Sequence, residues 1–311
     1  MPSEFDIIET YFAPLAGKEG VGLKDDAAHY CPSPSKKVVL SKDMLVESIH
    51  FLPDTNAEDL AWKALAVNIS DLVAKGAKPK GYLLGLGLPA MPTIDWLKSF
   101  AHGLDCAQTV FKCQLFGGDT VRTNKDLTFS VTVIGEADVD APLRSGAKAG
   151  DHIYVSGSLG GACYGLKSFR KEIAKNADLE QTYLRPQPRM DLISLISNYA
   201  SASADISDGL VADIGHIVDA SSVGAHLKAE DIPVNELINT PNLEEILTWG
   251  DDYEIVFTVD PSKEEEMLSY HDRHCSTPIH KIGLVKNDQG VTIVGKDETI
   301  LSYSKSGFNH F

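Results

Sequence analysis

The sequence predicts an α/β protein of two domains. Segments with the two-residue alternation of strands take turns along the chain with segments that carry the 3.6-residue period of helices. The chain has 311 residues, more than one hydrophobic core usually organises, so two domains are expected. Apolar periodicity stops near Ala141 and Pro142, and we therefore place the domains at residues 1–141 and 142–311.

The first domain is predicted to alternate strands with helices. Three segments have the apolar or β-branched character of strands: residues 37–41, 81–88 and 126–135. Two segments carry helical periodicity: residues 57–74 and 93–110. Pro92 and Thr93 provide a start signal for the second of these helices.

The second domain is predicted to begin with a strand over residues 151–157 that runs through Gly160-Gly161-Ala162 into a helix. Two more helices are expected, at residues 190–199 and 209–220. Three more strands are expected, at residues 253–259, 280–285 and 291–294.

Composition and charge narrow the functional class. Hydrophobic residues make up 43% of the chain and charged residues 23%, which is typical of a globular protein. The formal net charge of −16 argues against a nucleic-acid partner, which requires a basic surface. No apolar run approaches the length of a membrane span, and residues 1–15 lack the apolar core of a signal peptide. Five cysteines without paired spacing indicate reduced thiols, so we expect a cytoplasmic protein with no membrane partner.

Aspartates recur where strands end or the backbone is expected to turn. They are Asp25, Asp26, Asp43, Asp119, Asp205, Asp208, Asp251 and Asp252, and a further one, Asp71, lies inside an apolar helix. Mg²⁺ takes oxygen ligands and is commonly shared between a few carboxylates and substrate phosphates. The pattern therefore predicts an acidic cavity that holds several Mg²⁺ ions and a polyphosphate.

Several of these features have a purely structural alternative. The glycines of residues 157–161 are equally suited to receive a phosphate at a helix N-terminus or to form a tight packing turn. Ser207 or Asp208 would be a simple cap for the helix that follows, although one cap does not explain two aspartates and a serine. Asp71 fits a solvated helix face as well as a metal site. The P-loop signature for ATP is absent from the chain.

A series of motifs in this order resembles the thiamine-monophosphate kinase family and spans the chain from about Phe5 to Phe311. The motifs are Asp25-Asp26-Ala27-Ala28, Asp43-Met44-Leu45-Val46-Glu47 with His50-Phe51, Lys63-Ala64-Leu65-Ala66-Val67-Asn68-Ile69-Ser70-Asp71-Leu72, Gly117-Gly118-Asp119-Thr120, Arg144-Ser145-Gly146-Ala147, Leu184-Arg185-Pro186 with Pro188-Arg189, Asp205-Ile206-Ser207-Asp208-Gly209-Leu210, Gly250-Asp251-Asp252-Tyr253-Glu254 and Gly307-Phe308-Asn309-His310-Phe311. Each motif alone is weak evidence, whereas the ordered set is specific.

The resemblance implies a fold and a reaction. The fold is that of aminoimidazole ribonucleotide synthetase, with an N-terminal α/β domain whose strands form a barrel in a homodimer, and a C-terminal α/β domain. The reaction is the ATP- and Mg²⁺-dependent phosphorylation of thiamine monophosphate to thiamine diphosphate. A phosphate nucleophile is already ionised near neutral pH, so direct in-line transfer needs no strong general base.

The resemblance also implies site residues. Those similar to Mg²⁺ ligands are Asp26, Ser41, Lys42, Asp43, Asp71, Asp119, Asp205 and Asp208. Those similar to nucleotide contacts are Gly118, Asp119, Arg144 and Ser207, and those similar to thiamine contacts are His50, Asp251 and Phe308. No separate catalytic residue is expected beyond the metal ligands.

The chain departs from the family pattern at Lys24, Lys42 and Trp249, where relatives usually carry glycine, threonine and glycine. Lys42 has two interpretations: its ammonium lies beside the metal cluster and replaces part of a cation's charge, or only its carbonyl oxygen takes part. These departures keep two alternatives open. One is another ATP-dependent synthetase of the same fold, and the other is a catalytically silent Mg²⁺ or nucleotide-binding protein.

Overall fold

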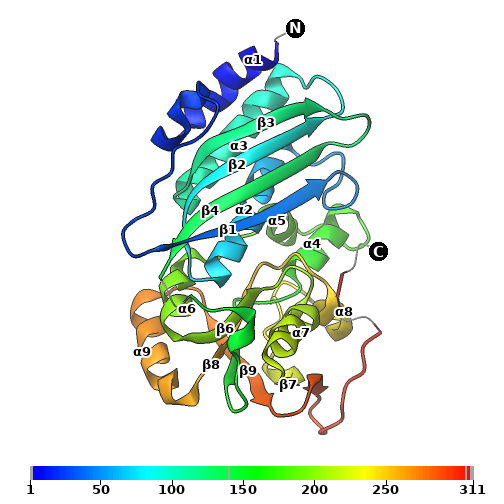
Figure 1. Ribbon diagram of the computed structural model, residues 1–311. Helices are drawn as coiled ribbons and strands as arrows, with labels where there is room; N and C mark the ends of the chain where they lie inside the picture. The colour runs from blue at the N-terminus through cyan, green and yellow to red at the C-terminus, as the bar shows by residue number, and fades with distance from the viewer. Residues whose placement is uncertain (1–2, 139–140, 305–306, 309–311) are drawn as a thin grey trace. The chain divides into compact units, whose positions relative to one another are not determined.

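The computed structural model describes residues 3–138, 141–304 and 307–308 (Figure 1). The chain divides into two compact units. The first unit comprises Met1–Leu72 and Lys78–Val139, and the second comprises Val73–Ala77 and Asp140–Phe311. The segment Val73–Ala77 belongs with the second unit although the sequence pattern places it in the first domain.

The first unit is built on a four-stranded sheet with the order β1-β4-β2-β3. Its strands are β1 (Lys37–Val46), β2 (Lys78–Leu88), β3 (Gln114–Arg122) and β4 (Thr128–Ala137). Strand β4 is antiparallel to both β1 and β2, whereas β2 and β3 are parallel. The crossover that this parallel pair requires between β2 and β3 contains the helix α3 (Ile94–Phe111).

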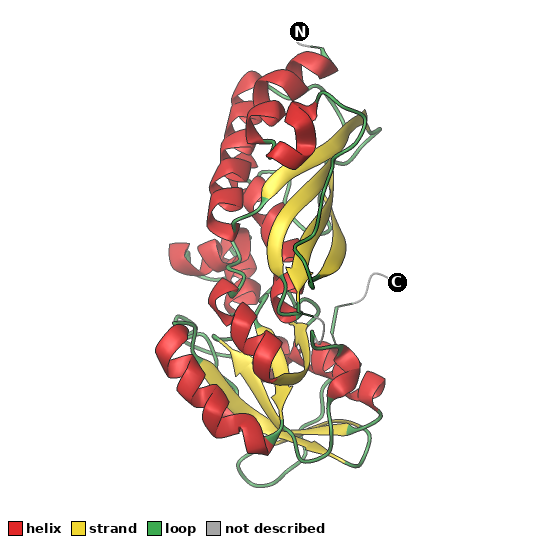
Figure 2. Cartoon of the chain, turned by 60° about the vertical axis from the view of Figure 1, so that its left-hand side comes forward, coloured by secondary structure: helices red, strands yellow, loops and turns green. Residues whose placement is uncertain are grey.

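Helices cover one face of this sheet (Figure 1 and Figure 2). They are α2 (Ala57–Ala74) and α3 (Ile94–Phe111). Short helical segments precede β1, namely α1 (Glu4–Ile7), η1 (Ile8–Phe12), η2 (Ala13–Leu15) and η3 (Lys18–Leu23). The rings of Trp96, Phe100 and Phe129 stack in sequence at centroid distances of 4.9 and 5.3 Å, which anchors α3 to β4.

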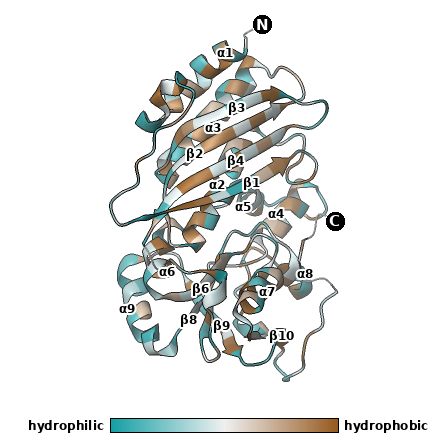
Figure 3. Ribbon diagram, in the orientation of Figure 1, coloured by the Kyte–Doolittle hydropathy of each residue, from teal (hydrophilic) through white to brown (hydrophobic). Residues whose placement is uncertain are grey.

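The other face of the four-stranded sheet carries no helix and is partly apolar (Figure 2 and Figure 3). Strand alternation directs one side chain in two toward this bare face. Exposed apolar side chains on it come from three strands: Val38, Leu40, Met44, Leu83 and Val121. Exposed apolar side chains gathered on one bare sheet face are typical of a contact surface.

The second unit contains a six-stranded sheet with the order β10-β7-β9-β5-β8-β6. Its strands are β5 (His152–Ser156), β6 (Ala200–Asp205), β7 (Gly224–Lys228), β8 (Ile255–Val259), β9 (Ile279–Lys286) and β10 (Gly290–Val294). Only β10 and β7 are parallel among these neighbouring pairs. Its helices are α4 (Gly161–Phe169), α5 (Ala177–Leu184), α6 (Ile193–Tyr199), α7 (Leu210–Ser221), α8 (Leu243–Thr248) and α9 (Glu264–His274), with the short η4 (Arg144–Gly146), η5 (Met190–Leu192), η6 (Ala229–Asp231) and η7 (Pro261–Lys263).

The mixed α/β architecture confirms the predicted fold class, and several elements match closely. Helix α2 has the predicted bounds, and α3 and α7 are each shifted by one residue. The expected turn at Gly117-Gly118-Asp119 is wrong, because these residues lie inside β3. Among the described residues, no helix is long and apolar enough to cross a bilayer, and all five cysteines are free thiols.

Candidate functional site

In the first unit, strand β1 and helix α2 bring two predicted metal ligands into contact. The Ser41 hydroxyl donates a hydrogen bond to Oδ2 of Asp71 at 2.5 Å. Two residues further along β1, the Asp43 amide donates a hydrogen bond to Oδ1 of Asn68 at 2.8 Å. Asn68 is itself buried and donates to the Ala64 carbonyl at 3.0 Å, so its orientation is fixed. Asn68 therefore holds β1 against α2. Ser41 and Asp43 lie on the face of β1 that packs against α2, where Asp71 is.

Lys42 lies between Ser41 and Asp43, so strand alternation sends its side chain to the bare face of the sheet. Its side chain is exposed there, away from the face on which Ser41 contacts Asp71. The Lys42 side chain is therefore on the opposite face of the sheet from Asp71 but on the same face as Asp119. Only its main-chain oxygen remains as a ligand atom.

Asp119 also lies on the bare face. The register pairs Met44 of β1 with Ser130, Ser130 with Gly85, and Gly85 with Asp119. Side chains paired across neighbouring strands point to the same side of a sheet, so Asp119 and Asp71 are separated by the sheet within one protomer. The sequence pattern predicts one acidic cluster, whereas the separation follows only from the register of the strands.

Gly118 fits its position because it has no side chain. A Cβ atom at residue 118 would lie 2.1 Å from the main-chain oxygen of Leu84 on the neighbouring strand β2. That contact is far shorter than any real one, so the glycine allows β3 to approach β2 closely. The Gly117-Gly118 pair, interpreted from the sequence as a turn, is instead a close packing of strands.

His50 and Asp26 lie outside the regular elements of the first unit. The Val46 amide donates to Nδ1 of His50 at 3.0 Å, so in the neutral ring the proton resides on Nε2. His50 therefore presents an N–H donor at its other nitrogen. Asp26 lies in an exposed bend, where its amide donates to Oδ1 of Asp25 at 2.9 Å.

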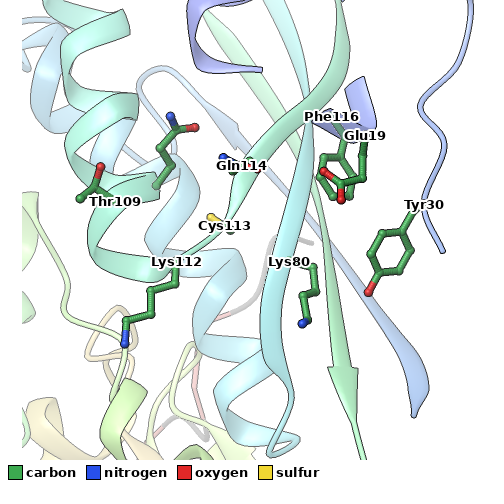
Figure 4. A pocket seen from close by; sticks show the side chains of 9 residues that line it. Glu19, Tyr30, Lys80, Thr109, Lys112, Cys113, Gln114 and Phe116 are labelled. Carbon is green, nitrogen blue, oxygen red and sulfur yellow. The ribbon is translucent and has the colours of Figure 1, made fainter. Parts of the chain in front are cut away.

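A hollow of about 440 Å³ in the first unit lies apart from these residues (Figure 4). Tyr30, Lys80, Thr109 and Lys112 are among the side chains around it, and no predicted site residue belongs to the described lining. The ammonium of Lys80 is 3.2 Å from a carboxylate oxygen of the buried Glu136. This cation is thus already paired, and the hollow adds nothing to the metal site.

In the second unit, the turn from Asp205 to Gly209 joins β6 to helix α7. Both the Asp208 and Gly209 amides donate to Oδ2 of Asp213, at 3.0 and 3.1 Å. The helix thus holds its own N-terminal turn through a residue that the sequence analysis missed, and neither Ser207 nor Asp208 provides the cap. Burial is the main reason that the pKa of Asp213 is raised to about 7.

Two other segments meet this turn and bring predicted substrate residues to it. The Asp251 amide donates to the Ser207 carbonyl at 2.9 Å, and the Phe308 amide donates to the Asp208 carbonyl at 3.0 Å. A Cβ at Gly250 would lie 1.8 Å from the Ser207 oxygen, so only glycine permits this approach. The second unit therefore gathers Ser207, Asp208, Asp251 and Phe308, four predicted site residues from three distant segments.

Arg144 belongs to the same neighbourhood. Its carbonyl accepts a hydrogen bond from the Ser221 hydroxyl at 2.9 Å, which ties η4 to helix α7. The positive charge of Arg144 acts on Asp213 and favours its ionised form, although burial outweighs this effect on the pKa. Asp205, at the end of β6, is buried beside this turn.

The glycine turn before α4 receives a carboxylate from the chain itself. The Gly160 amide donates to Oδ2 of Asp252 at 2.9 Å and the Ala162 amide to Oδ1 at 3.3 Å. Burial raises the pKa of Asp252 to about 7. The packing alternative for this turn is therefore the correct one, because Asp252 occupies the amides that a phosphate would need.

A buried ion pair supports the strands beside this site. Glu254 accepts from the Ser156 hydroxyl at 2.6 Å and from Nε of Arg189 at 2.8 Å, and a second nitrogen of Arg189 reaches its other oxygen. The pair is bidentate and Glu254 is almost fully buried, so each charge depends on the other. The Pro188-Arg189 motif thus has a structural role.

The oxygen donors of both units suit Mg²⁺. In the first unit they are the hydroxyl of Ser41 and the carboxylates of Asp43 and Asp71, and in the second the carboxylates of Asp205 and Asp208. Hard oxygen donors, few enough to leave room for water and phosphate, are the usual environment of this ion. The hydrogen bond between Ser41 and Asp71 places two such donors together.

Comparison with known proteins gives consistent matches over both units. The AIR synthase related protein N-terminal domain matches residues 24–137, and the C-terminal domain of the same name matches residues 148–296. Thiamine-monophosphate kinase of Buchnera aphidicola subsp. Schizaphis graminum is 35% identical and is matched over 99% of each chain. That of Escherichia coli strain K12 is 36% identical, over 99% of this chain and 98% of the relative. A solved structure, AaThiL complexed with AMPPCP and TMP, has a TM-score of 0.79 at 32% identity and covers 99% of this chain and 97% of its own.

Proposed function

We propose roles for the individual site residues from the premise that this chain belongs to the thiamine-monophosphate kinase family. The protein is an ATP-dependent kinase that phosphorylates thiamine monophosphate. The observation that best supports a working site is the turn in the second unit, where Ser207, Asp208, Asp251 and Phe308 meet.

The proposed reaction is a direct in-line transfer. An oxygen of the thiamine monophosphate phosphate attacks the γ-phosphorus of ATP, a new P–O bond forms, and the bond from the γ-phosphorus to the bridging oxygen breaks to release ADP. Both reactants are anions, so the main obstacle is their mutual repulsion. The attacking phosphate carries its negative charge near neutral pH, and the chain needs no separate base.

We propose Mg²⁺ ligands within each unit, each unit taken by itself. The proposed ligands are Asp26, Ser41, Asp43, Asp71 and Asp119, the main-chain oxygen of Lys42, and in the second unit Asp205 and Asp208. When bound, the ion supplies positive charge that offsets repulsion between the phosphates and stabilises charge on the transferred group. The chain itself sets the positions of these oxygens through Asn68 in the first unit and Asp213 in the second.

The nucleotide is proposed to contact Gly118, Asp119, Arg144 and Ser207. Arg144 offers the planar guanidinium that pairs with phosphate oxygens. Ser207 offers a hydroxyl, since its carbonyl is already used by the Asp251 amide.

Thiamine monophosphate is proposed to contact His50, Asp251 and Phe308. The Nε2–H of His50 would donate to a phosphate oxygen, because its Nδ1 is taken by the Val46 amide. Phe308 is 51% exposed, and its ring is proposed to stack on the cationic ring of thiamine. Asp251 supplies a negative charge beside that ring.

Product formation tests this assignment. We expect thiamine diphosphate and ADP in equal amounts when the protein is mixed with thiamine monophosphate, ATP and Mg²⁺, measured by liquid chromatography. Omission of Mg²⁺ or addition of a chelator should abolish both products, and thiamine should not replace its monophosphate. Formation of ADP without thiamine diphosphate would indicate another synthetase of this fold. Formation of neither product would indicate a catalytically silent binding protein.

We also propose that the protein acts in the cytoplasm without a nucleic-acid or membrane partner.

A homodimer is proposed through the bare face of the first-unit sheet. Leu40 on β1 is 63% exposed and lies with Val38 and Met44 on this apolar surface. A charge there would be desolvated if the surface were covered by a second copy.

We therefore expect Leu40→Asp to convert a dimer into a monomer in sedimentation velocity. Leu268→Asp, at an exposed leucine on α9, is the matched control and should leave the dimer intact. A monomeric parent protein, or a Leu40→Asp variant that remains dimeric, would remove this surface from the interface.

A further inference from the structure

The turn before helix α7 and the first two turns of the helix bring two carboxylates and an imidazole together. One potential ligand atom each from Asp208, Asp213 and His216 lies within 4.8 Å of the others. Asp213 and His216 are three positions apart in the helix and therefore lie on the same side of it. We propose that these three residues form a binding site for a transition-metal dication of the Co²⁺ or Zn²⁺ type.

A buried oxygen without a partner marks the position. Asp213 is only 1% exposed, and its Oδ2 receives the amides of Asp208 and Gly209. Its other oxygen, Oδ1, has no hydrogen-bond partner in the described part of the chain. Buried carboxylate oxygens are rarely left unsatisfied, and a cation is one group that satisfies such an oxygen.

The surrounding contacts arrange the three ligands before any cation binds. The two amide bonds to Asp213 fix the main chain of Asp208, and the Phe308 amide holds the Asp208 carbonyl from the other side. Asp208 is partly exposed and His216 is exposed, so a cation from solvent can approach along their side.

The donor set indicates the chemical class of the cation. The Asp208 carboxylate and the ionised form of Asp213 supply negative charge, and the neighbouring Arg144 offsets part of it. Mg²⁺ prefers oxygen donors and water, whereas an imidazole nitrogen favours Co²⁺, Ni²⁺ or Zn²⁺. The nitrogen of His216 is therefore the group that distinguishes this site from the oxygen-only Mg²⁺ ligands of the proposed reaction.

The site shares Asp208 with the proposed function but does not require that function. It needs neither nucleotide nor thiamine monophosphate, because all three ligands come from one turn and one helix. Its test can therefore be made without substrates, and the kinase assay can fail while the metal site is present, or the reverse.

Titration of the full-length protein with Co²⁺ tests the proposal, without substrates and without Mg²⁺, which would compete at the shared Asp208. Bound Co²⁺ is followed by its visible absorbance and by calorimetry. We expect the Co²⁺ affinity of one site to fall at least about 10-fold in His216→Gln. Loss of a residue that only supports a metal ligand lowers metal affinity by that much, and loss of a direct ligand should lower it no less. The matched control is His226→Gln, another histidine that contacts an aspartate but lies outside the cluster.

Asp213→Asn provides a second variant, because asparagine keeps one oxygen for the two amides and loses the charge and the free oxygen. It should also weaken Co²⁺ binding at least about 10-fold. A thermal melt establishes whether this variant folds, and if it does not, the His216→Gln result decides. Unchanged Co²⁺ affinity in His216→Gln, or an equal loss in His226→Gln, would overturn the proposal.

Discussion

Asp71→Asn should lower turnover by at least about 10²-fold, the scale on which loss of one main electrostatic group reduces catalysis. Asp71 accepts the Ser41 hydroxyl and lies on the face that also carries Asp43. Asparagine retains an oxygen for Ser41 but loses the negative charge that a cation needs. The fold should survive, because the substitution removes one charge from an acidic group and adds no volume. Asp43→Asn is expected to behave in the same way.

The measurement is steady-state turnover at saturating ATP, thiamine monophosphate and Mg²⁺, together with a thermal melt. The control is Asp95→Asn, which removes an equal charge from an exposed position on α3. It should leave turnover within about twofold, since solvent and salt screen the charge of an exposed side chain. An Asp71→Asn variant with near-normal turnover would remove Asp71 from the metal site.

Arg189→Met should reduce the free energy of unfolding of the second unit by roughly 3 kcal/mol, near the lower end of the cost of breaking a buried ion pair. The side chain of Glu254 is 2% exposed, and methionine leaves its charge without the bidentate partner. The Ser156 hydroxyl still donates to Glu254 but cannot replace a full positive charge.

Urea unfolding followed by circular dichroism measures this loss. Arg273→Met, at an exposed arginine of α9, should change the free energy of unfolding by less than about 0.5 kcal/mol. Adding Glu254→Gln to Arg189→Met should restore part of the stability, because the unpaired charge is then gone. If Arg189→Met and Arg273→Met have the same free energy of unfolding, the ion pair between Arg189 and Glu254 does not stabilise the second unit.

The site could be predicted from sequence where chemistry is local to a motif, and not where it depends on pairing across the chain. The aspartates and the Ser207-Asp208 turn were found because carboxylates beside glycines are a visible pattern. The sheet face on which Asp119 lies could not be predicted, because it follows from the register of β3 with β2. In addition, paired glycines indicate a turn as readily as a strand.

Long-range partners were missed for the same reason. Arg189 and Glu254 are 65 positions apart, and nothing in either segment indicates the other. Asp252 was noted as an aspartate after a glycine, but its role at the amides before α4 depends on folding. Asp213 did leave a local sign: it is a carboxylate on the apolar side of a helix, four residues after Gly209. A buried acid at that spacing is a candidate for holding the preceding turn.

The stereochemical course of the transfer tests the central claim most directly, namely that phosphate passes straight from ATP to thiamine monophosphate. ATP made chiral at the γ-phosphorus with sulfur and oxygen isotopes is used as donor, and the configuration of the terminal phosphorus of the product is determined. A single in-line step predicts inversion. Retention would require two displacements, and hence a phosphorylated side chain of the protein, and would contradict the account.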